Sequence, residues 1–193
     1  KVLLDFDYLV LTRKMAPQTQ WSEAKLNDYL NQSPLLARYE SGELSSSEFF
    51  ELIQRETDFT GGEAEFAALF EDIFTPISGM IDIHRQIAQS GTPTFTFSNT
   101  NEMAVRYISR TYDFWKMFNG HVLSYEVGAL KPEEKIYEAL EELSDLNGEE
   151  IIYLDDRSEN CAAGSERGWQ VCCHQDVESS RRFLSSVGDL SLT

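Results

Sequence analysis

Acidic, polar and basic side chains follow short apolar runs of this sequence, in a pattern that could hold a metal ion and a phosphate group. Two aspartates close the first run, a serine and an asparagine close the second, a lysine precedes a proline, and two aspartates close the last run. In chain order these side chains are Asp5, Asp7, Ser98, Asn99, Lys131, Asp155 and Asp156. If the runs are parallel strands, their carboxyl ends meet at one edge of a sheet, where such sheets bind ligands.

The four carboxylates suit a divalent cation better than a store of protons. Brought together without a cation, they would repel each other and their pKa values would rise. Oxygen-only ligands suit Mg²⁺, a hard ion that often shares a phosphate oxygen. We therefore predict a magnesium site, with Lys131 supplying a second positive charge. The expected ligands are Asp5, Asp7, Asp155 and Asp156.

The Asp5-x-Asp7 spacing allows two carboxylates to divide the work of phosphoryl transfer. Positions i and i+2 of a strand share one side, so both side chains can face one substrate. One carboxylate could attack phosphorus and form an acyl phosphate, while the other protonates the leaving oxygen and then activates water. Ser98, Asn99 and the backbone N–H groups that lead into a helix from Asn101 are expected to bind the phosphate.

The hydrophobic pattern predicts the elements that position these residues. Continuous apolar runs are typical of strands covered on both faces, and helical patterns alternate with them from about residue 79 onward. The sequence therefore predicts an α/β fold with a parallel sheet. The predicted strands are 2–7, 93–99, 121–126 and 151–156, with a weaker one at 169–174, and the helices are 80–89, 101–110, 132–143 and 158–167.

Residues 14–75 differ from the rest because they carry helical patterns and no convincing strand. The expected helices are 22–31, 34–40, 47–57 and 63–73. A helical block directly after the first strand indicates an insertion over the carboxyl end of that strand. We expect an α/β core formed by residues 1–13 and 76–193, and a helical cap formed by residues 14–75.

The charge of the chain limits its partners. The 193 residues include 33 acidic and 16 basic ones, for a formal net charge of −17. Such a field repels nucleic acid and anionic membranes, so neither is expected as a partner. Three cysteines give no disulfide framework, and no apolar run is long enough to span a membrane. We therefore expect a reduced, cytoplasmic protein, of unknown oligomeric state.

Four segments of the chain resemble, in the same order, the four motifs of the haloacid dehalogenase superfamily. LLDFDYLV is similar to the first motif, TFTFSNTNE to the second, GALKPEEKIY to the third and IIYLDDRSEN to the fourth. The resemblance runs from about Val2 to Asp176. It implies a Rossmann-like core with a small helical cap inserted after the first strand.

The resemblance also implies a role for each motif residue. Asp5 would be the nucleophile and Asp7 the general acid and base, while Ser98 and Lys131 would contact the phosphate. True haloacid dehalogenases lack an aspartate at the position of Asp7, so its presence favours phosphoryl chemistry. The implied Mg²⁺ ligands are Asp5, the backbone carbonyl of Asp7, and Asp156 with support from Asp155.

Within the superfamily, the SNTNE, GALKPE and DDRSEN runs look most like bacterial sugar-phosphate phosphatases that include α-glucose-1-phosphate phosphatase. The cap segment 38–50, RYESGELSSSEFF, is similar to that subgroup as well. The resemblance thus implies a phosphatase that hydrolyses a small phosphorylated metabolite, a sugar phosphate first, through an aspartyl phosphate. Tyr8, where many relatives have glycine, departs from the pattern.

Three other functions remain open at this stage. A phosphosugar mutase of the same superfamily would return the phosphoryl group to another hydroxyl. A phosphorelay receiver also phosphorylates an aspartate, although on a middle strand and without a helical insertion. A catalytically idle interaction domain could keep the fold. Outside the motifs, Asn160 is a candidate to support the metal ligands, and Tyr39 and Glu40 are candidates to reach the substrate from the cap.

Overall fold

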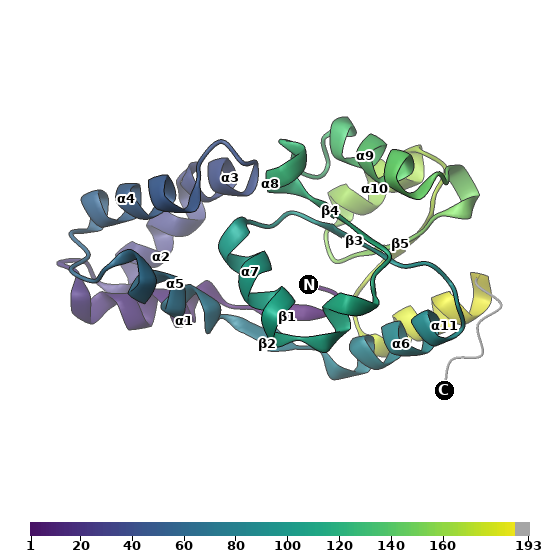
Figure 1. Ribbon diagram of the computed structural model, residues 1–193, viewed down its shortest axis with the longest axis horizontal. Coiled ribbons are helices and arrows are strands. Elements are labelled where there is room, and N and C mark those ends of the chain that lie inside the picture. Colours follow the sequence, from purple (N-terminus) through teal and green to yellow (C-terminus); the bar gives the residue numbers. More distant parts are fainter. Residues whose placement is uncertain (188–193) are drawn as a thin grey trace.

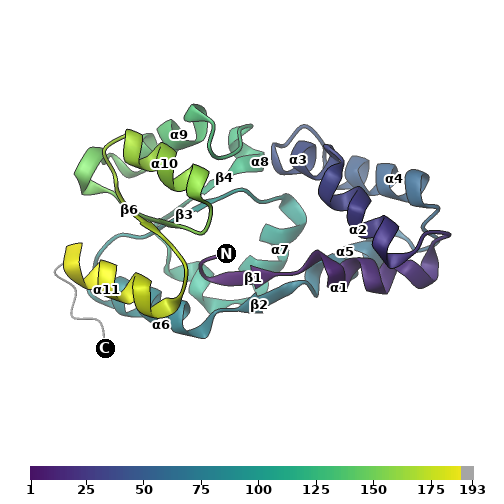
Figure 2. The same ribbon diagram turned by 180° about the vertical axis from the view of Figure 1, so that it is seen from behind.

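The computed structural model describes residues 1–187 of the chain, and Figure 1 shows an α/β body with a helical lobe beside it. The final residues of the predicted core segment, 188–193, lie outside the described residues. The strands lie in the middle of the body. In both views, helices α6 and α11 lie together on one side of the strands, and α9 and α10 lie on the other (Figure 2).

The six strands of the described residues form three pairs, of which two are parallel. The predicted strands are confirmed at all five runs, although each is shorter than expected. The parallel pairs match the predicted α/β class. The pairs are β1 (Leu4–Phe6) antiparallel to β2 (Phe74–Pro76), β3 (Phe95–Ser98) parallel to β4 (Gly120–Leu123), and β5 (Ile152–Asp155) parallel to β6 (Gln170–Cys173).

Strand β2 corrects the prediction that residues 14–75 contain no strand. It begins at Phe74 and pairs with β1, so that Asp5 lies opposite Thr75. The strand has three residues and ends in a proline, which has no N–H for a ladder hydrogen bond. A strand of three residues is too short to show an alternating pattern in the sequence. Only its pairing with β1 defines it.

The predicted strand 121–126 is wrong in its second half. Strand β4 ends at Leu123, and a short helix, α8 (Ser124–Val127), follows. The reason is tertiary: the Ser124 hydroxyl accepts a hydrogen bond from the Thr100 N–H at 2.9 Å and donates one to the Glu40 carbonyl at 2.6 Å. Gly128, with φ +71°, ends the helix.

The helical lobe consists of consecutive helices that follow β1. Its first helix was not predicted, and it begins at Tyr8 because the Asp7 side chain accepts a hydrogen bond from the Leu9 N–H. Residue 13 lies inside this helix, so the division of the chain at 13 and 75 stays a prediction. The helices are α1 (Tyr8–Met15), α2 (Glu23–Gln32), α3 (Leu35–Glu40), α4 (Ser46–Thr57) and α5 (Glu63–Glu71), with a 3₁₀ turn, η1 (Ala16–Gln18).

The helices of the α/β body confirm the predicted ones and add another at the C-terminal end. No helix within residues 1–187 is long and apolar enough to cross a membrane. The helices are α6 (Ser78–Gln89), α7 (Glu102–Thr111), α9 (Glu134–Ser144), α10 (Ser158–Glu166) and α11 (Val177–Val187), with 3₁₀ turns η2 (Asp113–Met117) and η3 (Gly148–Glu150).

The helical lobe shares its apolar core with helix α7. Phe49 and Phe66 of the lobe are fully buried, and they belong to the same cluster as Met103 and Ile108 of α7. The Tyr39 hydroxyl accepts a hydrogen bond from the Met103 N–H at 3.1 Å and so joins α3 to the start of α7. The lobe is therefore fastened to the helix that follows β3.

A second joint lies at Gly42, in the turn after α3. Its φ of +77° is in the left-handed region, and a Cβ at this position would lie 2.2 Å from the Tyr125 carbonyl oxygen. Only glycine combines this backbone conformation with such a close approach to another backbone.

We expect Gly42→Ala to destabilise the protein more than a matched glycine substitution. Gly91 has a similar φ of +86° but open space around its Cβ position. Both substitutions cost about 1–2 kcal/mol for the left-handed conformation. Only Gly42→Ala adds the clash, which overpacking studies place at about 1–3 kcal/mol. Urea unfolding of the two variants measures the difference, and equal losses would contradict the close approach.

Candidate active site

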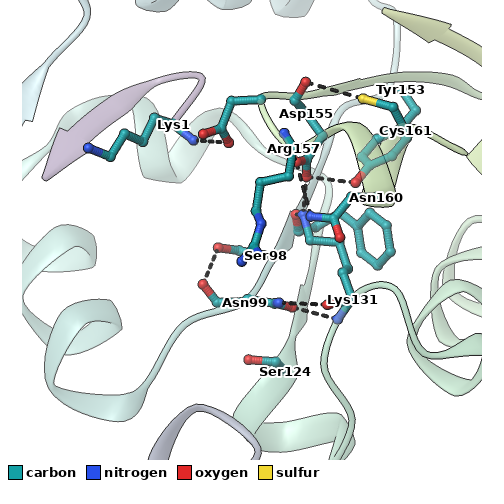
Figure 3. Close-up of polar contacts among 12 residues, drawn as sticks. Lys1, Ser98, Asn99, Ser124, Lys131, Tyr153, Asp155, Arg157, Asn160 and Cys161 are labelled. Atoms are coloured by element: carbon teal, nitrogen blue, oxygen red, sulfur yellow. Dashed lines mark hydrogen bonds and ion pairs between the residues drawn. The ribbon is translucent and has the colours of Figure 1, made fainter. Parts of the chain in front are cut away.

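Asp155, the last residue of β5, is the most heavily hydrogen-bonded side chain of the site. Its Oδ2 accepts from Lys131 Nζ at 2.5 Å and from the Tyr153 hydroxyl at 2.7 Å. Its Oδ1 accepts from the Arg157 N–H at 2.9 Å and from Asn160 Nδ2 at 3.0 Å. Figure 3 shows these donors around the carboxylate. Because both oxygens are occupied, Asp155 orients its neighbours and is a poor direct metal ligand.

Lys131 forms a buried ion pair with Asp155. The two side chains are each 6% exposed, and the ammonium also donates to the Phe97 carbonyl at 2.8 Å. It lies 4.8 Å from the centre of the Phe97 ring. Burial lowers the pKa of Lys131, and the Asp155 carboxylate opposes this shift. Burial would raise the pKa of Asp155, but the lysine charge and the hydrogen bonds hold it below its ordinary value.

Asn99 holds the backbone of Lys131 from both sides. The Asn99 side chain donates to the Lys131 carbonyl at 3.0 Å and accepts from the Lys131 N–H at 2.7 Å. This pair of bonds ties the loop after β3 to the loop before α9. Asn99 thus positions the lysine, and direct contact of its side chain with phosphate stays a prediction.

Ser98 and the loop that follows it lie at the start of helix α7. Asn101 caps that helix by accepting a hydrogen bond from the Ala104 N–H at 3.0 Å. The Ser98 hydroxyl donates to the Asn99 carbonyl at 3.2 Å, a contact that a ligand can replace. The N-terminus of a helix favours anions, because its first N–H groups and its dipole point at the ligand. The arrangement suits a phosphate oxygen at Ser98.

The two aspartates of the first strand lie apart from these groups. Asp5 is exposed, and its Oδ1 pairs with Lys1 Nζ at 2.8 Å, while the N-terminal ammonium of Lys1 pairs with Asp156. Asp7 is also exposed and caps α1 through the Leu9 N–H at 2.9 Å. Within the described structure, no direct contact joins Asp5 or Asp7 to Lys131 or Asp155.

A cavity of about 610 Å³ opens between β1 and the strands β3 and β5. Ser98, Lys131 and Asp156 line its polar edge. Leu4 and Phe6 of β1 line the cavity, whereas Asp5, between them in the strand, and Asp7 are not among its lining residues. The apolar walls include Leu4, Phe6, Tyr8, Phe70, Phe74 and Phe97.

Several observations bear on whether Mg²⁺ fits this edge. No group of three His, Cys, Asp or Glu side chains in residues 1–187 forms a ready metal cluster. However, a cation already lies at the Asp5 carboxylate, because Lys1 Nζ pairs with it at 2.8 Å. In addition, Asn160 Oδ1 is buried and has no hydrogen-bond partner in the described structure. The oxygen atoms of Asp5, Asp156 and Asn160 are hard donors of the kind that a divalent cation prefers. Of the two neighbouring aspartates Asp155 and Asp156, only Asp156 has a carboxylate available for the metal.

Two groups at this edge were not predicted from the sequence, and one predicted group lies elsewhere. Tyr153 supplies a hydroxyl to Asp155, and its place two residues earlier in the same strand is the signal that could have identified it. Arg157 lines the cavity beside Asp156. Tyr39 does not reach the cavity, because its hydroxyl is buried against Ser46. Asn160 contacts Asp155 as predicted.

The structure resembles solved enzymes of one fold family. A HAD family enzyme from Bacteroides thetaiotaomicron, in complex with magnesium and inorganic phosphate, superposes with a TM-score of 0.78 at 19% identity, over 90% of this chain and 89% of that chain. A predicted HAD-like hydrolase from Porphyromonas gingivalis gives a TM-score of 0.79 at 19% identity, over 94% and 92%. The chain has the haloacid dehalogenase fold. The Rossmann-like fold expected from the motifs is thus confirmed.

Other relatives of this fold differ in their chemistry. The L-2-haloacid dehalogenase PA0810 matches with a TM-score of 0.69 at 14% identity, over 96% of this chain and 95% of that chain. Among curated proteins, a sesquiterpene phosphatase from Aspergillus oryzae is 22% identical over 169 residues, which cover 86% of this chain and 85% of that protein. No family model matches the sequence.

We expect Lys131→Met to destabilise the protein by about 3–5 kcal/mol, because it leaves the Asp155 carboxylate buried without its partner. Urea unfolding measures the loss. Lys135→Met is the control, since Lys135 is exposed and makes only a 3.4 Å contact with the Gly128 carbonyl. The double variant Lys131→Met/Asp155→Asn should lose less than the sum of the two single losses. Additive losses would contradict the pairing.

We expect the stability of the wild type to fall relative to Glu40→Gln as the pH rises from about 5 to 8. Burial raises the pKa of Glu40 to about 7 from 4.5, while the Arg157 charge opposes the shift. Below 4.5 both states hold the proton; between 4.5 and about 7 only the folded state does, and stability is lost over this window. The change is on the order of 3 kcal/mol. Denaturation at several pH values measures it, and parallel profiles would contradict the shift.

Proposed function

We propose that the protein is a magnesium-dependent phosphatase that transfers the phosphoryl group of a small metabolite to Asp5 and then releases it to water. The observation that carries this proposal is the assembly at the carboxyl ends of β3 and β5. There Ser98 lies at a helix start and Lys131 is locked to Asp155. These groups come from three of the four motifs, in the order expected for phosphoryl transfer.

The chain's own residues divide the chemistry as follows. Asp5 is exposed and would attack the phosphorus atom, and Asp7 is exposed and would hand a proton to the leaving oxygen. Lys131, fixed by Asp155, contributes positive charge near the phosphate. Bound Mg²⁺ would be held by Asp5, the Asp7 carbonyl and Asp156, and would neutralise charge on the phosphoryl oxygens.

Phosphate and metal must displace the contacts that Lys1 makes. In the described structure Lys1 Nζ pairs with Asp5 at 2.8 Å. A bound divalent cation would take the place of this ammonium at Asp5 and would be shared with Asp156.

Phosphatase chemistry is favoured over dehalogenation by Asp7. A halide leaving group needs no proton, whereas an alkoxide does, so a second carboxyl beside the nucleophile is useful only for the latter. The magnesium and phosphate in the Bacteroides thetaiotaomicron enzyme and the activity named for the Aspergillus oryzae relative support the same reading.

Sugar phosphates are the first substrate class to test, because three motif runs and the cap segment resemble sugar-phosphate phosphatases. A second class has a specific observation in its favour. The walls of the cavity are mainly apolar, and one relative is a sesquiterpene phosphatase, which supports a terpenyl monophosphate. Phosphate release from a panel that contains both classes distinguishes them.

We expect Asp5→Asn to reduce phosphate release to background, because the amide cannot form the acyl phosphate. Asp7→Asn should lower kcat by about 10²–10⁴-fold through loss of proton transfer. EDTA should abolish the activity and added Mg²⁺ should restore it. Asp72→Asn is the control, since Asp72 is an exposed aspartate paired with Lys14, away from the motifs.

Two results would contradict this function. Activity that survives Asp5→Asn would remove the nucleophile from the proposal. A wild type that releases phosphate from no member of the panel would favour an idle interaction domain. Phosphorus NMR of the products separates a phosphatase from a phosphosugar mutase, because the mutase yields an isomeric phosphate ester in place of inorganic phosphate.

A further inference from the structure

We propose that Glu40 of the helical lobe and Arg157 of the α/β body bind hydroxyl groups of the leaving group and make the site selective for a polyhydroxylated phosphate ester. This inference rests on the proposed phosphatase function and names its substrate class. Both side chains line the cavity that also contains Ser98 and Asp156. They reach it from different parts of the fold, so a ligand bound between them touches both.

The backbone of Glu40 is held against the loop between β3 and α7. It is the last residue of α3, and its backbone carbonyl accepts a hydrogen bond from the Ser124 hydroxyl at 2.6 Å. The same hydroxyl oxygen accepts a hydrogen bond from the Thr100 N–H at 2.9 Å and lies 3.0 Å from the Thr100 carbonyl oxygen. Two residues later, Gly42 packs against the Tyr125 backbone. The backbone of Glu40 is thus tied to the loop between β3 and α7.

The Glu40 carboxylate, in contrast, has no assigned partner. Among residues 1–187, no side chain or backbone group donates a hydrogen bond to it, although it is partly buried. A buried carboxylate without donors is costly and is normally satisfied by a partner. Because it contributes no bond to the fold, this carboxylate is available to accept bonds from a ligand.

Arg157 supplies the complementary donors from the β5 side. Its guanidinium pairs with Glu159 through one edge, at 2.6 Å, and has further N–H groups because a guanidinium carries five. In Figure 3 the side chain extends from the end of β5 toward Ser98 and Asn99. Arg157 also exerts a favourable charge effect on Glu40.

The two groups match the chemistry of a polyol. A hydroxyl donates to a carboxylate and accepts from a guanidinium, so adjacent hydroxyls can satisfy both. A purely apolar leaving group would leave the Glu40 carboxylate buried and unpaired, which is how polar sites reject analogues that lack hydroxyls. The pair therefore favours a hexose phosphate over a terpenyl phosphate.

Steady-state kinetics of Glu40→Gln and Glu40→Ala test this inference. The substrates are a set of hexose phosphates and p-nitrophenyl phosphate, whose leaving group carries no such hydroxyls. We expect kcat/KM for the best hexose phosphate to fall about 10- to 100-fold, mainly through KM, with less than about a 3-fold change for p-nitrophenyl phosphate. Arg157→Ala should show the same selectivity. Glu43→Gln, on the same turn and paired with Arg38 at the surface, is the matched control.

Each other outcome overturns the inference. Equal losses on both substrates would assign Glu40 to the stability of the fold or to the chemical step, and thermal unfolding of the variants tells these apart. No selective loss, or a wild type that hydrolyses p-nitrophenyl phosphate or a terpenyl phosphate but no hexose phosphate, would remove the polyol as substrate. None of these results touches the proposed phosphatase function, which fails separately if the wild type is inactive on every ester or if Asp5→Asn stays active.

Discussion

The ion pair between Lys131 and Asp155 is the interaction on which the site depends. Taking both charges out of water is expensive, and the cost is recovered only if the pair and its hydrogen bonds are all in place. Here Tyr153 and Asn160 donate hydrogen bonds to the Asp155 carboxylate, and the Lys131 ammonium donates another to the Phe97 carbonyl. The result is a rigid bridge between the ends of β3 and β5.

The bridge also addresses the charge of the whole protein. A chain of net charge −17 repels a phosphorylated ligand, so positive charge has to be concentrated locally. Lys131 alone is largely neutralised by Asp155, and Arg157 lies at the same edge. A bound divalent ion would supply the rest of the positive charge that a phosphorylated ligand needs. Phosphate binding and metal binding are therefore expected to support each other at this site.

The helical lobe is attached to the start of α7 and to the short helix α8, which follow β3 and β4. Tyr39 bonds the start of α7, Ser124 bonds the carbonyl of Glu40, and Gly42 packs on the following turn. These contacts fix the backbone around Glu40, whose side chain lines the cavity. Rigid attachment favours selective recognition, because a ligand loses less ordering free energy when the recognising groups are already in place.

The sequence predicted the elements whose signals are local. The apolar runs before Ser98 and Asp155 became strands, and Lys131, expected at the same edge from its place in the loop before α9, pairs with Asp155. Features set by tertiary contacts were not predictable: β2 exists only through its pairing with β1, and α8 begins because Ser124 bonds a distant loop.

The first strand shows the same limit within the site. The spacing of Asp5 and Asp7 suits one side of a strand, but it cannot say which side faces the cavity. In the described structure Leu4 and Phe6 line the cavity, Asp5 pairs with Lys1, and Asp7 lies beyond β1 as the cap of α1. Which face of a strand turns toward a cavity depends on how the strand packs against the rest of the fold. The spacing of residues along the strand does not carry that information.

The measurement that tests the central claim most directly is the mass of the peptide that carries Asp5 after rapid acid quenching. Protein mixed with Mg²⁺ and a hydrolysed ester should show the mass of one added phosphoryl group on Asp5, and the label should disappear as turnover ends. Steady release of phosphate without any phosphorylated aspartate, or with the label on another residue, would contradict the account.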